Sequence, residues 1–204
     1  MVEGMRLALI DDDEAVLDAL GLYFLRNGIA LTCFSSADAF LASGPAEDAF
    51  DCIVADQRMP GMSGLDLVRH LHAQPGSPTV ILITGHGDID LAVQAMKAGA
   101  FDFVEKPFDE ADLLRRAMEG ASDTRERRKV LANREAVRSR IASLPTRQRE
   151  VLNLAVSGLS NKEIALHLNI SPRTVEGHRA WVMQRLGARN LADLIWMVMN
   201  TRNE

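Results

Sequence analysis

The fold of this chain is decided by one stretch of sequence, Asp51-Cys52-Ile53-Val54-Ala55-Asp56, which continues as Gln57-Arg58-Met59-Pro60-Gly61-Met62-Ser63-Gly64. Four mostly apolar residues lead into a polar stretch with Pro and Gly, and this pattern predicts a buried strand that runs into a loop. The carboxylate of Asp56 then lies at the C-terminal edge of a sheet, where open α/β folds place their functional groups. A single Asp in a loop is also a common turn former, so its role depends on what the rest of the chain brings to it.

Short apolar segments alternate with segments of helical periodicity throughout the first half of the chain. Besides the Asp56 segment, we predict strands at 7–10, 31–34, 80–84 and 101–104. The spacing of apolar residues predicts helices at 16–27, 36–41, 65–71 and 88–98, and a last one that begins at 109. Short strands that alternate with helices are typical of a parallel sheet covered on both faces, which is an α/β fold.

The polar residues at the ends of these strands form a chemically consistent set. In a parallel sheet all strands point the same way, so their C-terminal ends share one edge. The residues there are Asp11, Asp12, Asp56, Thr84 and Lys106. Clustered carboxylates repel one another unless a divalent cation neutralises them, and Mg²⁺ prefers oxygen ligands. A carboxylate beside Mg²⁺ can attack phosphorus and form an aspartyl phosphate. The alternative is an acidic helix cap at 11–14 with an unrelated ion pair to Lys106.

The formal net charge of −5 hides a strong asymmetry. Residues 1–120 contain 8 Lys/Arg and 20 Asp/Glu, a net of −12, whereas residues 121–204 contain 15 Lys/Arg and 8 Asp/Glu, a net of +7. This asymmetry suggests two domains, the second with a polyanionic partner, although solvated charged faces are the plainer explanation. We find no apolar run of membrane-spanning length and no secretory signal, and Cys33 and Cys52 are expected as two buried thiols in the reducing cytoplasm.

The basic part of the chain contains a helix-turn-helix pattern. Apolar periodicity predicts helices at 146–155, 160–168, 172–186 and 191–198. The second and third are joined by a tight turn, and Ser171 and Pro172 are suited to cap and to open the third. A short helix, a tight turn and a longer helix form a unit that places its second helix in the major groove of DNA.

We predict three parts from these patterns: a first domain at 1–120, a charged helical connector at 121–142 and an all-α, four-helix domain at 143–204. The connector carries seven Lys and Arg residues, few apolar residues and no proline, so it can continue the preceding helix. A direct role of its arginines in DNA binding is the alternative.

The first domain resembles the receiver domain of bacterial response regulators. The resemblance rests on Ile10-Asp11-Asp12, on Asp56 with Met59-Pro60-Gly61, on Thr84 and on Lys106-Pro107, and it covers residues 5–120. It implies a flavodoxin-like, doubly wound sheet and phosphorylation of Asp56. It also implies Mg²⁺ bound by Asp12, Asp56 and the backbone carbonyl of Arg58, with Asp11 nearby. Thr84 and Lys106 would bind the phosphoryl group, and Phe103 would be an aromatic switch residue. Arg58 and His86 would control the lifetime of the phosphoryl group.

The second domain is similar to the DNA-binding domain of the LuxR type, and a receiver joined to such a domain is typical of the NarL/FixJ class. The similarity rests on 149–152, 158–165 and 170–178. It implies DNA binding by Lys162, Arg173, Thr174, Glu176, Gly177, His178 and Arg179. Lys162, Arg173 and Arg179 are suited to contact phosphates. Glu176 can accept a hydrogen bond from a cytosine amino group. We expect Trp181 and Trp196 in the core or in a dimer interface.

These features together predict a phosphorylation-activated transcription regulator. A sensor histidine kinase would donate the phosphoryl group, the receiver would dimerise and the second domain would bind promoter DNA, with RNA polymerase as a further candidate partner. The protein would not be an enzyme. A Mg²⁺-dependent phosphatase with an Asp nucleophile is the enzymatic alternative, but it needs a second acid where this chain has Arg58. A constitutive DNA-binding protein with an inactive receiver is the other alternative, and the complete set of edge residues disfavours it.

Overall fold

The computed structural model describes residues 4–44, 49–85 and 89–202. The chain divides into two compact units on either side of the bond between Lys129 and Val130. This division falls within the predicted connector, and helix α5 (Glu110–Ala142) contributes residues to both units. None of the described helices is long and apolar enough to cross a membrane.

The first unit is built on a parallel sheet of five strands. The strands are β1 (Arg6–Ile10), β2 (Ala30–Phe34), β3 (Cys52–Asp56), β4 (Thr79–Thr84) and β5 (Asp102–Glu105). Their order in the sheet is β2-β1-β3-β4-β5, and every neighbouring pair is parallel. This is the order of flavodoxin-like folds, so the predicted α/β fold class is confirmed.

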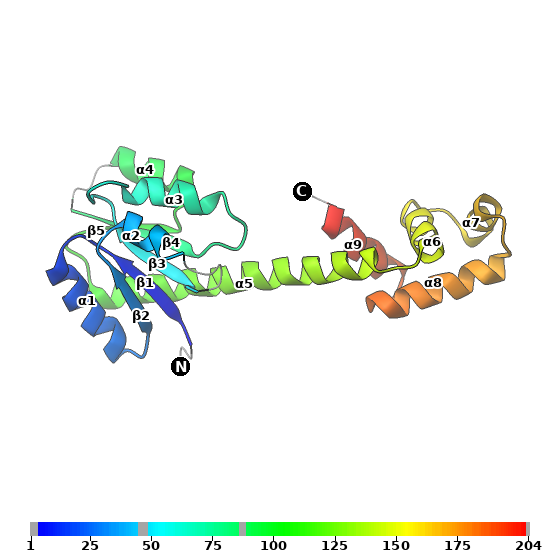
Figure 1. Cartoon of the computed structure of the whole chain (residues 1–204), viewed down its shortest axis with the longest axis horizontal. Coiled ribbons are helices and arrows are strands. Elements are labelled where there is room, and N and C mark those ends of the chain that lie inside the picture. The colour runs from blue at the N-terminus through cyan, green and yellow to red at the C-terminus, as the bar shows by residue number, and fades with distance from the viewer. Residues whose placement is uncertain (1–3, 45–48, 86–88, 203–204) are drawn as a thin grey trace. The chain divides into compact units, whose positions relative to one another are not determined.

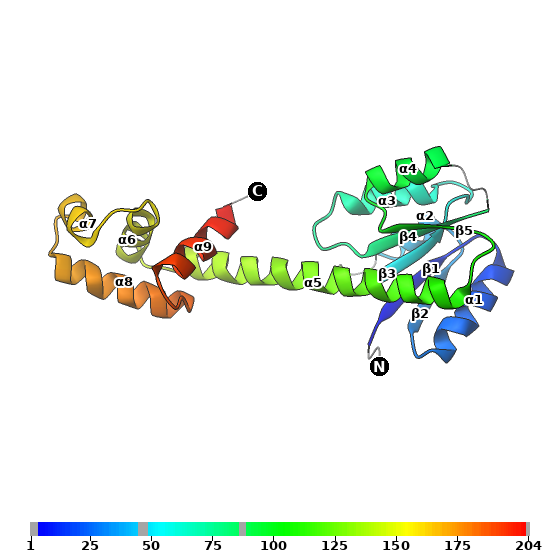
Figure 2. The same ribbon diagram turned by 180° about the vertical axis from the view of Figure 1, so that it is seen from behind.

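Helices cover both faces of the sheet (Figure 1, Figure 2). One face packs against α2 (Ala37–Ala42), α3 (Gly64–His72) and α4 (Ile89–Ala98), and the other packs against α1 (Glu14–Arg26) and α5. Every residue of the central strands β3 and β4 is buried, which explains why these segments are apolar runs and do not alternate.

Capping residues and glycine fix the ends of two helices of the first unit where the sequence predicts them. The side chain of Ser36 accepts the backbone N–H of Ala39 at 3.0 Å and caps α2, as predicted. Helix α1 ends at Arg26 with Asn27 as its C-cap, and Gly28 follows with a φ of +78°, in the left-handed region that glycine tolerates best.

The two cysteines differ in exposure, and the expectation of two buried thiols is wrong for one of them. Cys52 lies in β3 and is buried, and burial raises the pKa of its thiol to about 12. Cys33 is exposed. It lies on β2, which is an edge strand and therefore has a neighbouring strand on one side only.

The second unit contains the four predicted helices together with the last part of α5. They are α6 (Thr146–Val156), α7 (Asn161–Leu168), α8 (Pro172–Leu186) and α9 (Leu191–Arg202). Val175 of α8 packs with residues of α6 and α7, and Leu186 packs with residues of α6 and α9. Trp181 and Trp196 are 40% and 61% exposed, so neither is the core residue that we considered. A place in a dimer interface stays a prediction for both.

Candidate functional site

The C-terminal edge of the sheet gathers the polar residues that the sequence singles out. Asp56 is the last residue of β3 and lies beside Ile83 of β4, and Thr84 is the last residue of β4. Asp11 directly follows β1, and Lys106 directly follows β5. The parallel register therefore brings residues that are up to 95 positions apart in the sequence to one edge.

Lys106 connects the two buried carboxylates of this edge. Its Nζ donates to Oδ1 of Asp56 at 2.7 Å and to Oδ2 of Asp11 at 3.1 Å. The second oxygen of each carboxylate accepts a backbone N–H, from Arg58 at 2.6 Å for Asp56 and from Asp13 at 2.9 Å for Asp11. Each carboxylate is thus fixed by one cationic and one backbone donor, which sets its orientation before any ligand arrives.

The electrostatics of the edge favour a further cation. Burial raises the pKa of Asp11 above its ordinary value, although the bonds from Asp13 and Lys106 oppose this. Burial alone would lower the pKa of Lys106, but the hydrogen bonds to Asp56 and Asp11 outweigh it and the pKa is raised. One ammonium therefore serves two carboxylates, and the exposed Asp12 adds a third negative charge beside them.

These residues fit a magnesium ion through their chemistry. Within the described ranges, no three His, Cys, Asp or Glu side chains converge into a group that could hold a metal by themselves. Mg²⁺ does not need such a cage, because it keeps several waters and is commonly held by one or two carboxylates. Asp11 and Asp56 already meet at one ammonium, so the edge offers the oxygen donors that this ion prefers.

The structure places two of the other residues predicted for this region, Phe103 and Thr84. Phe103 lies on β5, is half-buried and packs against the core on the side of α2, α3 and α4. Thr84 is buried at the end of β4, and its carbonyl accepts the backbone N–H of Lys106 at 2.7 Å. His86 lies outside the described residues. Gly85, which follows Thr84, has open space where a Cβ would be.

The loop after Asp56 is held by residues outside the predicted site. Oδ2 of Asp38, on α2, accepts the backbone N–H of Met62 at 3.1 Å. A Cβ at Gly64 would lie 2.5 Å from the carbonyl oxygen of Asp56 and 2.8 Å from Leu82. Only a glycine therefore allows α3 to begin so close to the end of β3. In the sequence, the only sign of this contact is that a glycine, Gly64, directly precedes the predicted helix at 65–71.

The second unit orders its helix-turn-helix through caps at both helix starts. Ser160 and Glu163 form a reciprocal capping box at the start of α7. The turn residue Asn169 has a φ of +52°, in the left-handed region. Ser171 caps α8 by accepting the N–H of Thr174 at 3.1 Å, and its hydroxyl lies 2.8 Å from that of Thr174. The predicted roles of Ser171 and Pro172 at this helix start are confirmed.

Helix α8 presents most of the predicted DNA-binding residues to solvent. Lys162 on α7 is exposed, and so are Arg173, Thr174, Glu176 and Gly177 on α8. Two residues are placed differently. His178 is half-buried, and the half-buried Arg179 donates to Oδ1 of Asn161 on α7 at 2.5 Å. Arg179 thus also ties α8 to α7.

One arginine outside the predicted set stabilises the same unit. Arg147 of α6 donates to the carbonyl oxygen of Leu168, at the end of α7, and pairs with Glu150 at 2.9 Å. It satisfies a carbonyl that has no partner within its own helix. The sequence offered no signal for this role, because the two residues are 21 positions apart.

Comparisons with known proteins agree with this architecture. Residues 7–118 match the response regulator receiver domain, and residues 142–198 match the luxR family of bacterial regulatory proteins. The transcriptional regulatory protein FixJ of Azorhizobium caulinodans is 45% identical over 98% of this chain and 94% of its own length. The C4-dicarboxylate transport transcriptional regulatory protein DctR of Rhodobacter capsulatus is 45% identical over 93% of this chain and 96% of its own length.

Solved structures of similar proteins cover nearly the whole chain. The response regulator StyR aligns with a TM-score of 0.80 at 38% identity over 95% of this chain and 98% of its own. Full-length FixJ from B. japonicum aligns with a TM-score of 0.57 at 39% identity over 98% of each chain. The chain therefore belongs to the response regulators that join a receiver domain to a LuxR-type DNA-binding domain, a family of transcription regulators activated by phosphorylation.

Proposed function

We propose that Asp56 accepts a phosphoryl group from a phosphohistidine of a sensor kinase. The observation that carries this proposal is the position of Lys106, whose Nζ lies 2.7 Å from Asp56 and 3.1 Å from Asp11. A carboxylate oxygen of Asp56 attacks phosphorus, the P–N bond to the kinase histidine breaks, and the imidazole leaves. The Lys106 ammonium then remains beside the new acyl phosphate and offsets the added negative charge.

Mg²⁺ is the cofactor that we assign to this edge. Asp11, Asp12, Asp56 and the backbone carbonyl of Arg58 would hold it. When bound, the ion neutralises the clustered carboxylates and the phosphoryl oxygens. The chain's own residues orient the acceptor, because the Arg58 N–H and the Lys106 ammonium each bond one oxygen of Asp56.

Phosphorylation would be read out through the face formed by α4 and β5. Thr84 would bind the phosphoryl group and Phe103 would repack, as in the response regulators that the chain resembles. Helix α4 exposes Ile89, Val93 and Met96, which are 79%, 45% and 51% exposed and recur at helical spacing. An apolar stripe of this kind is suited to pairing with a second copy of the receiver. A full switch between two states needs ~5.5 kcal/mol of differential binding, and we assign part of it to dimerisation.

The second unit would place α8 in the major groove of promoter DNA. Lys162, Arg173 and Arg179 would contact phosphates, and Glu176 would read a base edge. Two units in a dimer would meet half-sites about one helical turn apart. Because promoter DNA is the proposed partner, we assign the protein to the cytoplasm. RNA polymerase would be a further partner at the promoter.

The two alternatives make different demands on the site. A phosphatase with an Asp nucleophile needs a second acid two residues after it, and Arg58 stands there, so we propose no enzymatic function on external substrates. A constitutive DNA-binding protein would not need a receiver with a fixed acceptor. The bonds that fix both oxygens of Asp56 favour a receiver that is phosphorylated.

Sedimentation velocity with an acyl-phosphate mimic tests the proposal. Wild type and Asp56→Asn are compared in Mg²⁺, with and without beryllofluoride. We expect the mimic to dimerise the wild type and to leave the variant unchanged, because the variant lacks the carboxylate that the mimic binds. Dimerisation of both, or of neither, would contradict activation through Asp56.

A further inference from the structure

A further buried carboxylate lies at the opposite end of β3 from Asp56. Asp51 immediately precedes this strand, and it is only 2% exposed. Its Oδ2 accepts the backbone N–H of Arg6 at 2.9 Å and a guanidinium N–H of Arg125 at 2.8 Å. Oδ1 lies 3.7 Å from Nη1 of Arg128. A buried charge needs such partners, and here two of the three come from α5.

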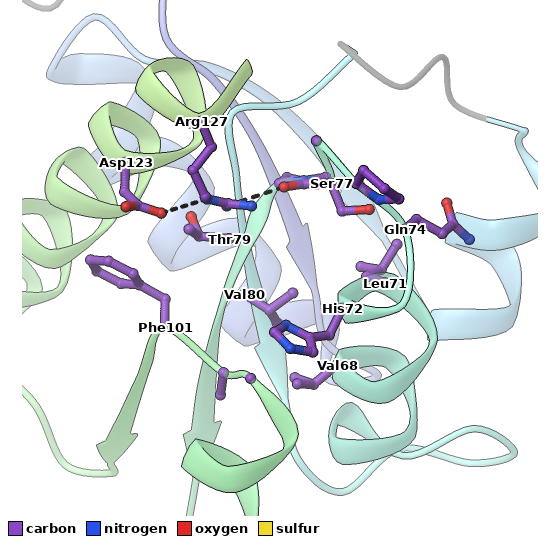
Figure 3. A pocket seen from close by; sticks show the side chains of 15 residues that line it. Val68, Leu71, His72, Gln74, Ser77, Thr79, Val80, Phe101, Asp123 and Arg127 are labelled. Atoms are coloured by element: carbon purple, nitrogen blue, oxygen red, sulfur yellow. Dashed lines mark hydrogen bonds and ion pairs between the residues drawn. The ribbon is translucent and has the colours of Figure 1, made fainter. Parts of the chain in front are cut away.

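Three arginines of α5 also bond the backbone at the N-terminal edge of the sheet. Arg125 donates to the carbonyl of Gly4, before β1. Arg128 donates to the carbonyls of Phe50 at 2.9 Å and Gly76 at 2.7 Å, before β3 and β4. Arg127 reaches from Asp123 to the carbonyl of Ser77, as Figure 3 shows, and forms one side of a cavity of about 370 Å³.

Helix α5 approaches the sheet closely along this segment. A Cβ at Gly120 would lie 2.7 Å from Oγ1 of Thr79 and 3.4 Å from Sγ of Cys52. Thr124 is fully buried, and its Oγ1 accepts the backbone N–H of Thr79 at 2.9 Å. The helix therefore supplies a hydrogen-bond acceptor to the backbone N–H of the first residue of β4.

We propose that Asp51, Thr124, Arg125, Arg127 and Arg128 form an arginine clamp that makes residues 119–129 part of the receiver and couples its state to the DNA-binding unit. The receiver match ends at residue 118, and the clamp residues of α5 lie beyond it, at 124–128. Strand β3 then bonds this part of the chain at two places: Asp56 bonds Lys106, in the segment that leads into α5, and Asp51 bonds Arg125 within α5. A change at Asp56 is therefore linked to a helix that is fixed at Arg125 and that continues into the second unit.

The clamp also gives these arginines of the basic stretch a role other than DNA binding. Their guanidinium groups are directed to a buried carboxylate and to backbone carbonyls of the receiver. This inference rests on the proposed function for its coupling, and on the contacts alone for the extent of the receiver.

Hydrogen exchange of the full-length protein tests the extent of the receiver. We expect amides of 119–129 to exchange as slowly as the sheet in the wild type, and on the order of tenfold faster or more in Asp51→Asn. Glu119→Gln is the matched control, because it removes the same charge from an exposed pair with Arg115 on the same helix. It should leave exchange at 120–129 unchanged. Equal exchange in wild type and Asp51→Asn would overturn the clamp.

DNA binding with and without beryllofluoride tests the coupling. In Asp51→Asn, the mimic should still dimerise the protein in sedimentation velocity, but the gain in affinity for DNA should fall at least threefold against the wild type. An unchanged gain would refute the coupling even if exchange becomes faster. If Asp51→Asn does not fold, Arg125→Gln replaces it, because Asp51 then keeps Arg6 and Arg128. A wild type that ignores the mimic would refute the proposed function, while the exchange experiment still decides the clamp.

Discussion

Replacing Asp51 by Asn should destabilise the receiver and leave the DNA-binding unit unchanged. Removal of one partner of a buried ion pair costs roughly 3–5 kcal/mol, because the other charge stays buried. The side chains of Arg125 and Arg128 are 39% and 19% exposed, so they regain part of their hydration. The Asn oxygen can still accept the Arg6 N–H. We therefore expect the free energy of unfolding of the receiver to fall by about 2 kcal/mol.

The chain carries its own control for this measurement. Both tryptophans, Trp181 and Trp196, lie in the second unit, and the single tyrosine, Tyr23, lies in the first. Urea unfolding followed by Trp fluorescence therefore reports the second unit, whereas circular dichroism reports both. With a slope of roughly 2 kcal/mol per M urea, the receiver transition should move down by about 1 M while the fluorescence transition stays in place. A loss below about 0.5 kcal/mol, the range of ordinary surface substitutions, would refute the role of Asp51.

The pH dependence of this difference has a defined sign. Burial alone would raise the pKa of Asp51, but the bonds from Arg125 and from the backbone N–H of Arg6 outweigh it and the pKa is lowered. A carboxyl whose pKa is lower in the folded state stabilises the fold above its unfolded pKa, about 3.9, and loses this contribution as the pH falls through the folded value. The difference between wild type and Asp51→Asn should therefore be constant near neutral pH and shrink below about pH 4.

Three further changes test the site and the DNA-binding surface. Gly64→Ala should lower the free energy of unfolding of the receiver by about 1–3 kcal/mol in urea unfolding, because the added Cβ would lie 2.5 Å from the carbonyl oxygen of Asp56. It should also slow the labelling of Asp56 by acetyl phosphate. Gly85→Ala is the neutral control for stability, because its Cβ would lie in open space. Lys106→Met should abolish dimerisation by beryllofluoride in sedimentation velocity, since Asp56 loses the ammonium at 2.7 Å; a dimer that still forms would show that Lys106 is dispensable. Arg173→Ala should weaken binding to all DNA sequences and lower the salt slope in anisotropy titrations by about one, whereas an effect on one base position only would contradict a phosphate contact.

The sheet and the polar residues at its C-terminal edge were predictable because they depend on local patterns and on one geometric rule. Apolar runs identified β3 and β4, and the parallel direction of strands that alternate with helices brought Asp56 and Lys106 to one edge. Cys33 shows the limit of this reasoning. Its segment, Leu31-Thr32-Cys33-Phe34, looks like any other short strand, but the place of β2 at the edge of the sheet follows from strand order, which no local pattern contains.

The opposite edge could not be predicted, because its contacts join distant parts of the chain. Asp51 and Arg125 are 74 residues apart, and Thr79 and Thr124 are 45 residues apart. In the sequence, Asp51 is one polar residue before a strand, and Arg125 is one of several arginines in a charged helix. Only the packing of α5 on the sheet shows that the two meet.

The same point changes how the charge asymmetry of the chain is interpreted. The net of +7 in residues 121–204 suggests a polyanionic partner, but Arg125, Arg127 and Arg128 belong to this count and their guanidinium groups bond receiver groups. Lys162 and Arg173 are exposed on the helix-turn-helix and remain available for phosphates. Composition can locate a basic region, whereas the partner of each charge depends on the fold. The arginines that look most like a DNA-binding cluster in the sequence are therefore the ones that we expect to make no direct contact with DNA and to matter for the stability of the receiver.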